Sequence, residues 1–357
     1  MFPSLDLWER LLLSSAVAFA IAYLMTPPVK RFAEAVGAMD VPKDERRVHN
    51  HPIPRMGGLA IFLGFVLSVL LFVDMSTQVM GLLLGTVIIA VMGALDDIMN
   101  LNAWIKLAGQ ILAAGVAIRC GIVVDAISNF TPAGGTTFLN TYWLAIPVTV
   151  IWIVACTNAV NLIDGLDGLA VGVSTISSLT MLVVSLFVAE PVVSLILAAL
   201  TGACVGFMPY NLNPAKIFMG DVGSQMLGFV LATVSIMGMF KFHAIISFLV
   251  PLLALAVPLA DTVFAFFRRI FHGQSPFHAD KGHFHHRLLA LGMSQKQAVA
   301  VLYGVSAVLG LIAVLMAGQS VAVRVVCIIA AFLISITVWQ LVLRSVPKHP
   351  KGENEEK

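Results

Sequence analysis

Long uninterrupted apolar runs recur along this chain and limit what it can fold into. A helix needs about 20 mostly apolar residues to cross the hydrocarbon core of a bilayer. Eleven such runs lie near residues 8–28, 56–73, 78–95, 103–123, 142–160, 167–188, 192–210, 223–240, 243–267, 298–317 and 321–343. Charged residues make up only 11% of the chain, and the mean hydropathy is +0.96. The sequence therefore predicts an all-α, polytopic integral membrane protein with about 11 transmembrane helices.

Lys and Arg residues are distributed unevenly between the predicted loops. With the N-terminus outside, the inner segments hold 17 of the 21 Lys and Arg residues, which leaves Arg10, Arg119, Lys241 and Arg324 outside. Cytoplasmic loops of membrane proteins carry this excess of positive charge. The distribution predicts an outside N-terminus, a cytoplasmic C-terminus and an odd number of spans.

The remaining segments are too short to form a soluble domain. We expect a single transmembrane domain over residues 1–346, with cytoplasmic loops at 29–55 and 268–297 and a disordered cytoplasmic tail at 347–357. The first apolar run lacks a small-residue cleavage site, so it is interpreted as a retained span. The net charge of +2 gives no reason to expect a nucleic-acid partner. The four cysteines lie in or beside apolar runs without metal-type spacing, which is typical of buried apolar side chains.

Acidic residues stand where predicted spans end on the inner side. Asp96 and Asp97 close the third span, and adjacent carboxylates at the edge of hydrocarbon need a metal, a base or a proton to stabilise them. Asp221 opens the eighth span, where helix N–H groups favour phosphate and a carboxylate can hold a bridging cation. Phe218, just before it, is open to two interpretations, stacking on a base or packing at the membrane interface.

A second polar segment follows the fifth span. Asn158, Asn161, Asp164 and Asp167 recur every three residues, and a continuous helix would wind them half-way round its surface towards lipid. We therefore expect the helix to end near Asn161 and a turn at Gly165 to point both carboxylates into one pocket. A calcium loop is a weaker reading, because the further ligands and the terminal Glu are missing.

Two loops add basic and histidine residues. Arg47 and His49 precede the Gly57-Gly58 pair, which permits close approach of the backbone either to a neighbouring helix or to a phosphate. Basic residues in such a loop also simply follow the positive-inside rule or bind lipid headgroups. Arg268 stands at the start of the second loop and precedes its histidines.

That second loop contains His283, His285 and His286. Three histidines in one segment cannot close a tetrahedral zinc site unaided, so we expect them to donate to phosphate and sugar. Asp261, inside the ninth span, is either a functional acid or a partner for a basic residue.

Together and in this order, the motifs resemble the polyprenyl-phosphate N-acetylhexosamine-1-phosphate transferase family, glycosyltransferase family 4. They are Pro54-x-Met56-Gly57-Gly58, Asp96-Asp97, Asn161-Leu162-x-Asp164-Gly165-x-Asp167-Gly168, Phe218-Met219-Gly220-Asp221-x-Gly223-Ser224 and His283-Phe284-His285-His286. The likeness runs from about residue 26 to residue 290. The histidine segment and its Arg-Leu-Leu ending are similar to the branch that uses UDP-N-acetylglucosamine and primes teichoic acid, O-antigen (lipopolysaccharide) or related polymers.

The resemblance implies a phosphoglycosyl transferase that depends on Mg²⁺, with Mn²⁺ as a substitute. Such an enzyme transfers N-acetylglucosamine-1-phosphate from UDP-N-acetylglucosamine to undecaprenyl phosphate, and releases UMP. It also implies that residues 1–346 form a catalytic domain in the cytoplasmic membrane, in contact with membrane lipids. The active site would face the cytoplasm, and the chain would form a homodimer.

Individual roles follow from the same resemblance. It implies that Asp96 and Asp97 are catalytic and that Asp221 binds the metal. The substrate-binding residues that it implies are Arg47, His49, Asn161, Asp164, Asp167, Asn211, Phe218, Arg268, His283, His285 and His286. One departure from the family pattern is that no acidic or basic residue follows Asp97 until Lys106, which leaves the lower wall of the lipid-phosphate site unassigned.

Two alternatives stay open. Within the family, the branch that transfers phospho-MurNAc-pentapeptide typically shows three consecutive histidines, which this chain lacks. A secondary transporter also has many spans and intramembrane acids, but it places ionisable residues near the middle of the bilayer.

Overall fold

Nearly every element of this structure is an α-helix. The computed structural model describes residues 5–41, 52–124, 142–239, 244–271 and 283–318, together with Val326 and Ile329. Its helices are α1 (Leu7–Ala35), α2 (Gly58–Phe72), α3 (Thr77–Met99), α4 (Ala103–Arg119), α5 (Tyr142–Leu162), α6 (Leu169–Phe187), α7 (Pro191–Asn211), α8 (Gly220–Met239), α9 (Ala244–Ala254), α10 (Ala256–Phe271), α11 (Phe284–Ala290) and α12 (Gln295–Gly318). Two short strands, β1 (Met39–Asp40) and β2 (Ile53–Pro54), pair antiparallel with Met39 opposite Pro54.

Seven of the described helices are long and apolar enough to cross a membrane. They are α1, α3, α5, α6, α7, α8 and α12. The apolar helix α2 has 15 residues and α4 has 17. The predicted all-α, multi-pass membrane class is confirmed. The count of eleven spans and the orientation of the termini stay predictions, since the last expected span at 321–343 lies outside the described residues except for Val326 and Ile329.

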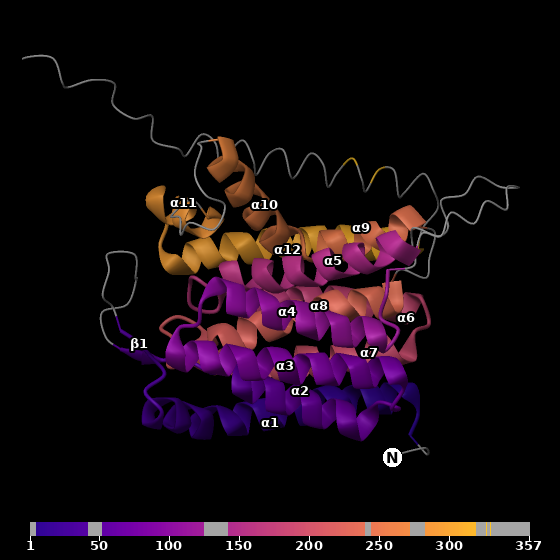
Figure 1. Cartoon of the computed structure of the whole chain (residues 1–357), viewed down its shortest axis with the longest axis horizontal. Helices are drawn as coiled ribbons and strands as arrows, with labels where there is room; N and C mark the ends of the chain where they lie inside the picture. The colour runs from indigo at the N-terminus through magenta and orange to yellow at the C-terminus, as the bar shows by residue number, and fades with distance from the viewer. Residues whose placement is uncertain are drawn as a thin grey trace, which may run out of the picture.

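The helices lie side by side in a bundle, and α8 runs through its centre (Figure 1). This helix packs against α3, α5, α2, α6, α9 and α7. Its residues are buried along almost the whole length. Glycine makes the close packing possible, because a Cβ at Gly228 would lie 2.6 Å from the carbonyl oxygen of Cys156 on α5. The N-terminal turn of α8 is therefore fixed by neighbours on several sides.

The predicted ninth span at 243–267 is wrong as a single helix, because the chain breaks at Leu255 into α9 and α10. Pro258 has no N–H to donate to the carbonyl of Ala254, which a continuous helix requires. The Ser177 hydroxyl of α6 donates to that carbonyl instead, at 2.6 Å. Figure 1 shows α10 leaving the bundle beyond this break.

Helical structure extends into the two expected inner loops. Helix α1 continues past the predicted span to Ala35, and the strand pair β1–β2 brackets residues 42–51, which lie outside the described residues. The expected loop 268–297 contains the end of α10, the short helix α11 and the first residues of α12. The expected tail, residues 347–357, also lies outside the described residues.

The polar motifs gather at one end of the bundle. The C-terminal ends of α3, α5 and α7 lie there, together with the N-terminal ends of α4, α6 and α8. This arrangement follows from short connections between antiparallel neighbours, which return the chain to the same end every second helix.

Candidate active site

The N-terminus of α8 is held by Asp97, at the C-terminal end of α3. Its carboxylate accepts the backbone N–H groups of Asp221 at 3.0 Å and of Val222 at 3.3 Å. Asp97 is 2% exposed, and Arg55 Nε lies 3.8 Å from its Oδ1. A carboxylate in this place satisfies helix N–H groups that have no partner within the helix and favours the helix dipole. Both oxygens of Asp97 are thus used to position Asp221.

The Gly57-Gly58 pair brings the start of α2 against the same turn. Gly57 donates its N–H to the carbonyl of Phe218 at 2.9 Å, and Gly58 donates to the carbonyl of Met219 at 2.8 Å. A Cβ at Gly58 would lie only 2.1 Å from the backbone nitrogen of Gly223. Of the two readings left open by the sequence, the structure supports close approach to a neighbouring helix.

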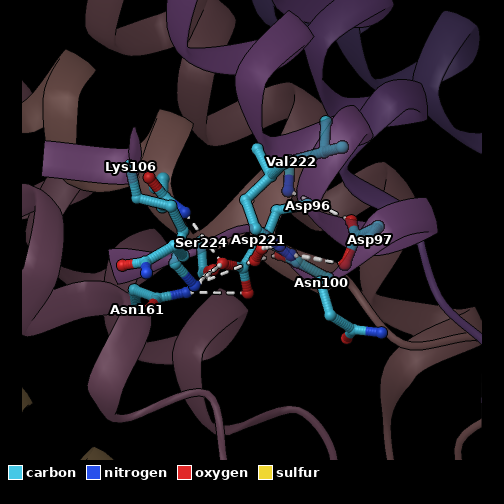
Figure 2. Close-up of polar contacts among 12 residues, drawn as sticks. Asp96, Asp97, Asn100, Lys106, Asn161, Asp221, Val222 and Ser224 are labelled. Atoms are coloured by element: carbon cyan, nitrogen blue, oxygen red, sulfur yellow. Dashed lines mark hydrogen bonds and ion pairs between the residues drawn. The ribbon is translucent and has the colours of Figure 1, made fainter. Parts of the chain in front are cut away.

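Side chains from three helices converge on the Asp221 carboxylate (Figure 2). Lys106 Nζ of α4 lies 3.1 Å from Oδ2, and Gln225 Nε2 donates to the same oxygen at 2.8 Å. Asn161 Nδ2 of α5 donates to Oδ1 at 3.1 Å and contacts Ser224 Oγ at 2.8 Å. Asp221 is therefore held as a hydrogen-bond acceptor on both oxygens.

Lys106 joins Asp221 to Asp96. Its Nζ lies 2.9 Å from Asp96 Oδ2, while the other oxygen of Asp96 accepts the N–H of Leu101 at 2.6 Å. Two carboxylates from α3 and α8 thus face one positively charged point. Within the ranges that the structure describes, no group of three or more His, Cys, Asp or Glu side chains is placed to hold a metal ion. Mg²⁺ usually takes one or two carboxylates and completes its shell with water and substrate phosphate, so this pair fits Mg²⁺.

Asp164 lies in the turn between α5 and α6, within electrostatic reach of Asp221 and Asp97. The helix ends at Leu162, and Gly165 donates its N–H to the carbonyl of Ile163 at 2.8 Å, as expected for a turn. Burial, followed by the negative charges of Asp221, Asp97 and Asp167, raises the pKa of Asp164 to about 8. This carboxyl group is therefore mostly protonated at neutral pH unless a cation or a donor approaches it.

Asp167 and Asn211 brace the loop between α7 and α8. Asp167 Oδ2 accepts Asn213 Nδ2 at 2.9 Å and the backbone N–H of Ala215 at 3.0 Å. Asn211, 2% exposed, donates Nδ2 to the carbonyl of Ile217 at 3.0 Å. These contacts shape the loop that leads into α8 and carries Phe218.

The histidine segment packs against the turn that carries Asp164. A Cβ at Gly165 would lie 2.5 Å from Nε2 of His285, so only a glycine lets the two segments meet. The His285 ring stacks on that of His283 with centroids 5.8 Å apart and lies 4.3 Å from that of His286. Burial, followed by the neighbouring His286, lowers the pKa of His285 to about 3, despite the opposing charge of Asp261. His285 is therefore a neutral imidazole at physiological pH.

Asp261 proves to be a partner for this segment. Its Oδ2 lies 2.9 Å from His283 Nδ1, and its Oδ1 accepts the N–H of Phe284 at 2.7 Å. Asp261 and His283 are both buried. Arg268, one of the predicted substrate-binding residues, lies 5.6 Å above the ring of Phe264 on the same helix, α10. Asp261 thus connects α10 to the start of α11.

The predicted residues fall into three groups. The structure brings Asp96, Asp97, Asn161, Asp164 and Asp221 together. Asp167, in the turn between α5 and α6, and Asn211, at the end of α7, brace the loop that carries Phe218, and the three histidines lie in the segment beside that turn. Arg268 lies on α10, and Arg47 and His49 lie outside the described residues.

Sequence reasoning missed three residues of the site, Lys106, Ser224 and Gln225. The spacing of Gln225, four residues after Asp221 in an otherwise apolar helix, was a usable signal, because residues at i and i+4 share a helix face. Lys106 is the first basic residue after Asp97 in the sequence, and the structure sets it against both Asp96 and Asp221.

A multi-pass bundle of apolar helices that brings carboxylates and a lysine together at one end defines a membrane protein with a charged site at that end. The model of glycosyl transferase family 4 matches residues 79–239. The chain is 38% identical to the probable undecaprenyl-phosphate N-acetylglucosaminyl 1-phosphate transferase of Bacillus subtilis, over 87% of this chain and 86% of that protein. It is 37% identical to the decaprenyl-phosphate N-acetylglucosaminephosphotransferase of Mycobacterium tuberculosis, over 83% and 80%. It is 31% identical to the phospho-N-acetylmuramoyl-pentapeptide-transferase of Staphylococcus aureus, over 84% and 96%.

The chain belongs to glycosyl transferase family 4 and is an enzyme of this phosphotransferase type. The expected family and the expected enzyme class are confirmed.

Proposed function

We propose that this enzyme transfers N-acetylglucosamine-1-phosphate from UDP-N-acetylglucosamine to undecaprenyl phosphate, in a reaction that requires Mg²⁺. The observation that carries the proposal is the meeting of Asp96 and Asp221, from α3 and α8, at one positively charged point. Such a point suits a substrate whose reacting groups are phosphates bridged by a cation. The relatives named for N-acetylglucosaminyl phosphate transfer support the choice of sugar.

The carboxylate of Asp221 would hold the metal ion, and Asp96 is joined to it through Lys106. When bound there, Mg²⁺ supplies neutralisation of pyrophosphate charge. Asn161 and Gln225 keep the Asp221 carboxylate in place by donating to it. Lys106 adds a second positive charge within reach of both carboxylates, suited to an incoming phosphate.

The transfer itself is a substitution at phosphorus. An oxygen of the lipid phosphate forms a bond to the β-phosphorus of the UDP-sugar, and the bond from that phosphorus to the oxygen bridging the α-phosphorus breaks. UMP leaves, and the sugar pyrophosphate stays on the lipid. Phosphate monoesters lose their second proton near pH 6, so little base strength is needed. Asp96 then serves mainly to orient Lys106 and the lipid phosphate, with catalysis coming from position and charge.

The nucleotide and the sugar take the remaining face of the site. Asn161, Asp164 and the loop that carries Phe218 line the side proposed for uridine, and Asn211 and Asp167 keep that loop in shape. The histidine segment lies across the turn from them and donates to the phosphates and the N-acetyl sugar. Neutral His285 suits this role, because an uncharged imidazole offers one donor and one acceptor.

The excess of Lys and Arg in alternate loops supports an orientation with this end of the bundle at the cytoplasm, where nucleotide sugars are available. The product is then the first lipid-linked intermediate of a cell-envelope polymer such as teichoic acid or O-antigen.

The decisive test is the mass of the lipid product formed by purified enzyme with undecaprenyl phosphate, Mg²⁺ and a panel of UDP-sugars. We expect a product with UDP-N-acetylglucosamine and a matching release of UMP, both lost in Asp221→Asn. Asp74→Asn is the matched control, because Asp74 is an exposed carboxylate in the connection between α2 and α3, away from the site, and pairs with Arg10.

The alternatives give different results. A product only with UDP-MurNAc-pentapeptide would assign the enzyme to the peptidoglycan branch, and no UMP with any donor would favour a transporter. Near-normal turnover by Asp221→Asn at saturating Mg²⁺ would remove Asp221 from the metal role.

A further inference from the structure

A second layer of polar side chains lies one helical turn further into the bundle than the site. Lys106, Asn161 and Asp221 form the first layer, on α4, α5 and α8. Each of these helices carries an amide side chain within one turn of its first-layer residue, on the side away from the end of the bundle. They are Gln110 on α4, Asn158 on α5 and Gln225 on α8. Gln110 and Gln225 are each 1% exposed. Asn158 is half-buried. Buried amides among apolar helices are costly, so two of them joined to a third indicate a role.

The amides form a chain of hydrogen bonds that ends at Asp221. Gln225 Nε2 donates to Asp221 Oδ2 at 2.8 Å. Gln110 Nε2 donates to Gln225 Oε1 at 3.1 Å, and Asn158 Nδ2 donates to Gln110 Oε1 at 2.7 Å. Asn158 Nδ2 also donates to the carbonyl of Val154 at 2.8 Å. The chain therefore crosses α8, α4 and α5 without a break.

The carboxylate fixes the direction of every amide in this chain. Asp221 as an anion only accepts hydrogen bonds, so Gln225 must turn its NH₂ group to it and its oxygen away. That oxygen requires the NH₂ group of Gln110, whose oxygen in turn requires the NH₂ group of Asn158. Reversal of any one amide would set oxygen against oxygen in a buried site, which is strongly unfavourable.

We propose that Gln225, Gln110 and Asn158 are positioning residues that hold the Asp221 carboxylate as an acceptor aimed at the cation. The proposal rests on the proposed function, in which Asp221 binds Mg²⁺. Gln110 and Asn158 touch neither Asp221 nor the reacting groups, and they act through Gln225. Loss of a residue that orients a metal ligand typically lowers metal affinity about 10- to 100-fold.

The test compares Gln110→Met and Gln225→Met with the wild-type enzyme in detergent. Methionine keeps the length and flexibility of glutamine but removes the amide. The first measurement is the rise in unfolding temperature on adding Mg²⁺ alone, and the second is the Mg²⁺ concentration for half-maximal turnover. We expect that concentration to rise about tenfold in both variants, with the maximal rate largely recovered at high Mg²⁺. The double variant adds little to either single one, because both break the same chain.

Ser178→Ala is the control for a buried hydrogen bond lost elsewhere. Ser178 Oγ pairs with Thr201 Oγ1 at 2.8 Å between α6 and α7. This variant is expected to unfold at a lower temperature with an unchanged Mg²⁺ requirement. Asn158→Ala tests the far end of the chain at a half-buried position, so the proposal does not depend on the folding of the Gln110 variant.

The outcomes separate this proposal from the proposed function. If Asp221→Asn keeps the wild-type response to Mg²⁺, the metal role of Asp221 is wrong. If Asp221→Asn loses that response while Gln110→Met and Asn158→Ala keep it in full, the amide chain has no positioning role and the proposal is overturned.

Discussion

Replacement of Gly58 by alanine should disturb both stability and turnover, because Gly58 is where α2 meets α8 backbone to backbone. The added Cβ would lie 2.1 Å from the nitrogen and 2.2 Å from the Cα of Gly223. That is about 1.3 Å short of ordinary van der Waals contact. No flexible side chain can yield there, so the two helices must separate by about 1 Å.

The cost follows from what that separation breaks. The hydrogen bonds from Gly57 and Gly58 to the carbonyls of Phe218 and Met219 would stretch, and each contributes roughly 1 kcal/mol. Overpacking adds roughly 1–3 kcal/mol. We therefore expect Gly58→Ala to lower the free energy of unfolding by roughly 3 kcal/mol. Asp221 moves with the same turn, and a displacement of about 1 Å at a reacting centre lowers kcat about 100-fold.

Thermal unfolding in detergent and turnover with UDP-N-acetylglucosamine measure the two effects. Gly115→Ala and Gly304→Ala are matched controls, because a Cβ at either position meets nothing within 4 Å. Both glycines lie inside helices, α4 and α12, so alanine should stabilise each by about 0.5–1 kcal/mol. The reasoning is refuted if Gly58→Ala unfolds at the temperature of these controls and turns over at their rate.

Two further predictions concern charge. Lys106→Met leaves Asp96 and Asp221 facing each other without the ammonium group that they share. The free energy of unfolding in EDTA should therefore fall by roughly 2 kcal/mol. Added Mg²⁺ should recover much of the loss, and an equal loss with and without Mg²⁺ would contradict this. Burial holds the pKa of His285 near 3, below its unfolded value of 6.5. Below pH 6.5 the unfolded chain binds a proton at His285 that the folded chain does not bind, so the free energy of unfolding falls as the pH drops from 6.5 towards 3. Between pH 7 and pH 5 the free energy of unfolding of the wild type should fall by about 2 kcal/mol through this residue, a loss that His285→Gln avoids. Thermal unfolding at each pH measures the difference.

Much of the site was predictable because water and hydrocarbon sort residues by polarity. Asp96, Asp164 and Asp221 each follow or precede an apolar run, and the alternation of spans brings such ends to one side of the bundle. The turn at Gly165 was also predictable, since a continuous helix would have exposed carboxylates to lipid. The family followed from the order of the motifs.

The specific role of each carboxylate was not predictable in the same way. Asp96 and Asp97 are neighbours with the same chemistry, yet Asp97 is committed to the N–H groups of α8 while Asp96 meets Lys106. Which one turns inward depends on the rotation of α3 against α8. Asp167 was predicted as a second pocket carboxylate, and the structure adds that its Oδ2 braces the loop through Asn213.

The sequence by itself determined that this chain is a helical membrane enzyme whose polar groups lie at the ends of its spans, because hydrocarbon tolerates neither unpaired backbone nor stray charge. Only the tertiary structure decided which atoms meet. Lys106 contacts two carboxylates on other helices, and the amide chain behind Asp221 crosses three helices. At the break near Leu255, Ser177 of α6 donates to the carbonyl of Ala254. All these contacts join residues far apart in the sequence. Such contacts depend on the distance and rotation between helices, which packing sets and apolar periodicity does not encode.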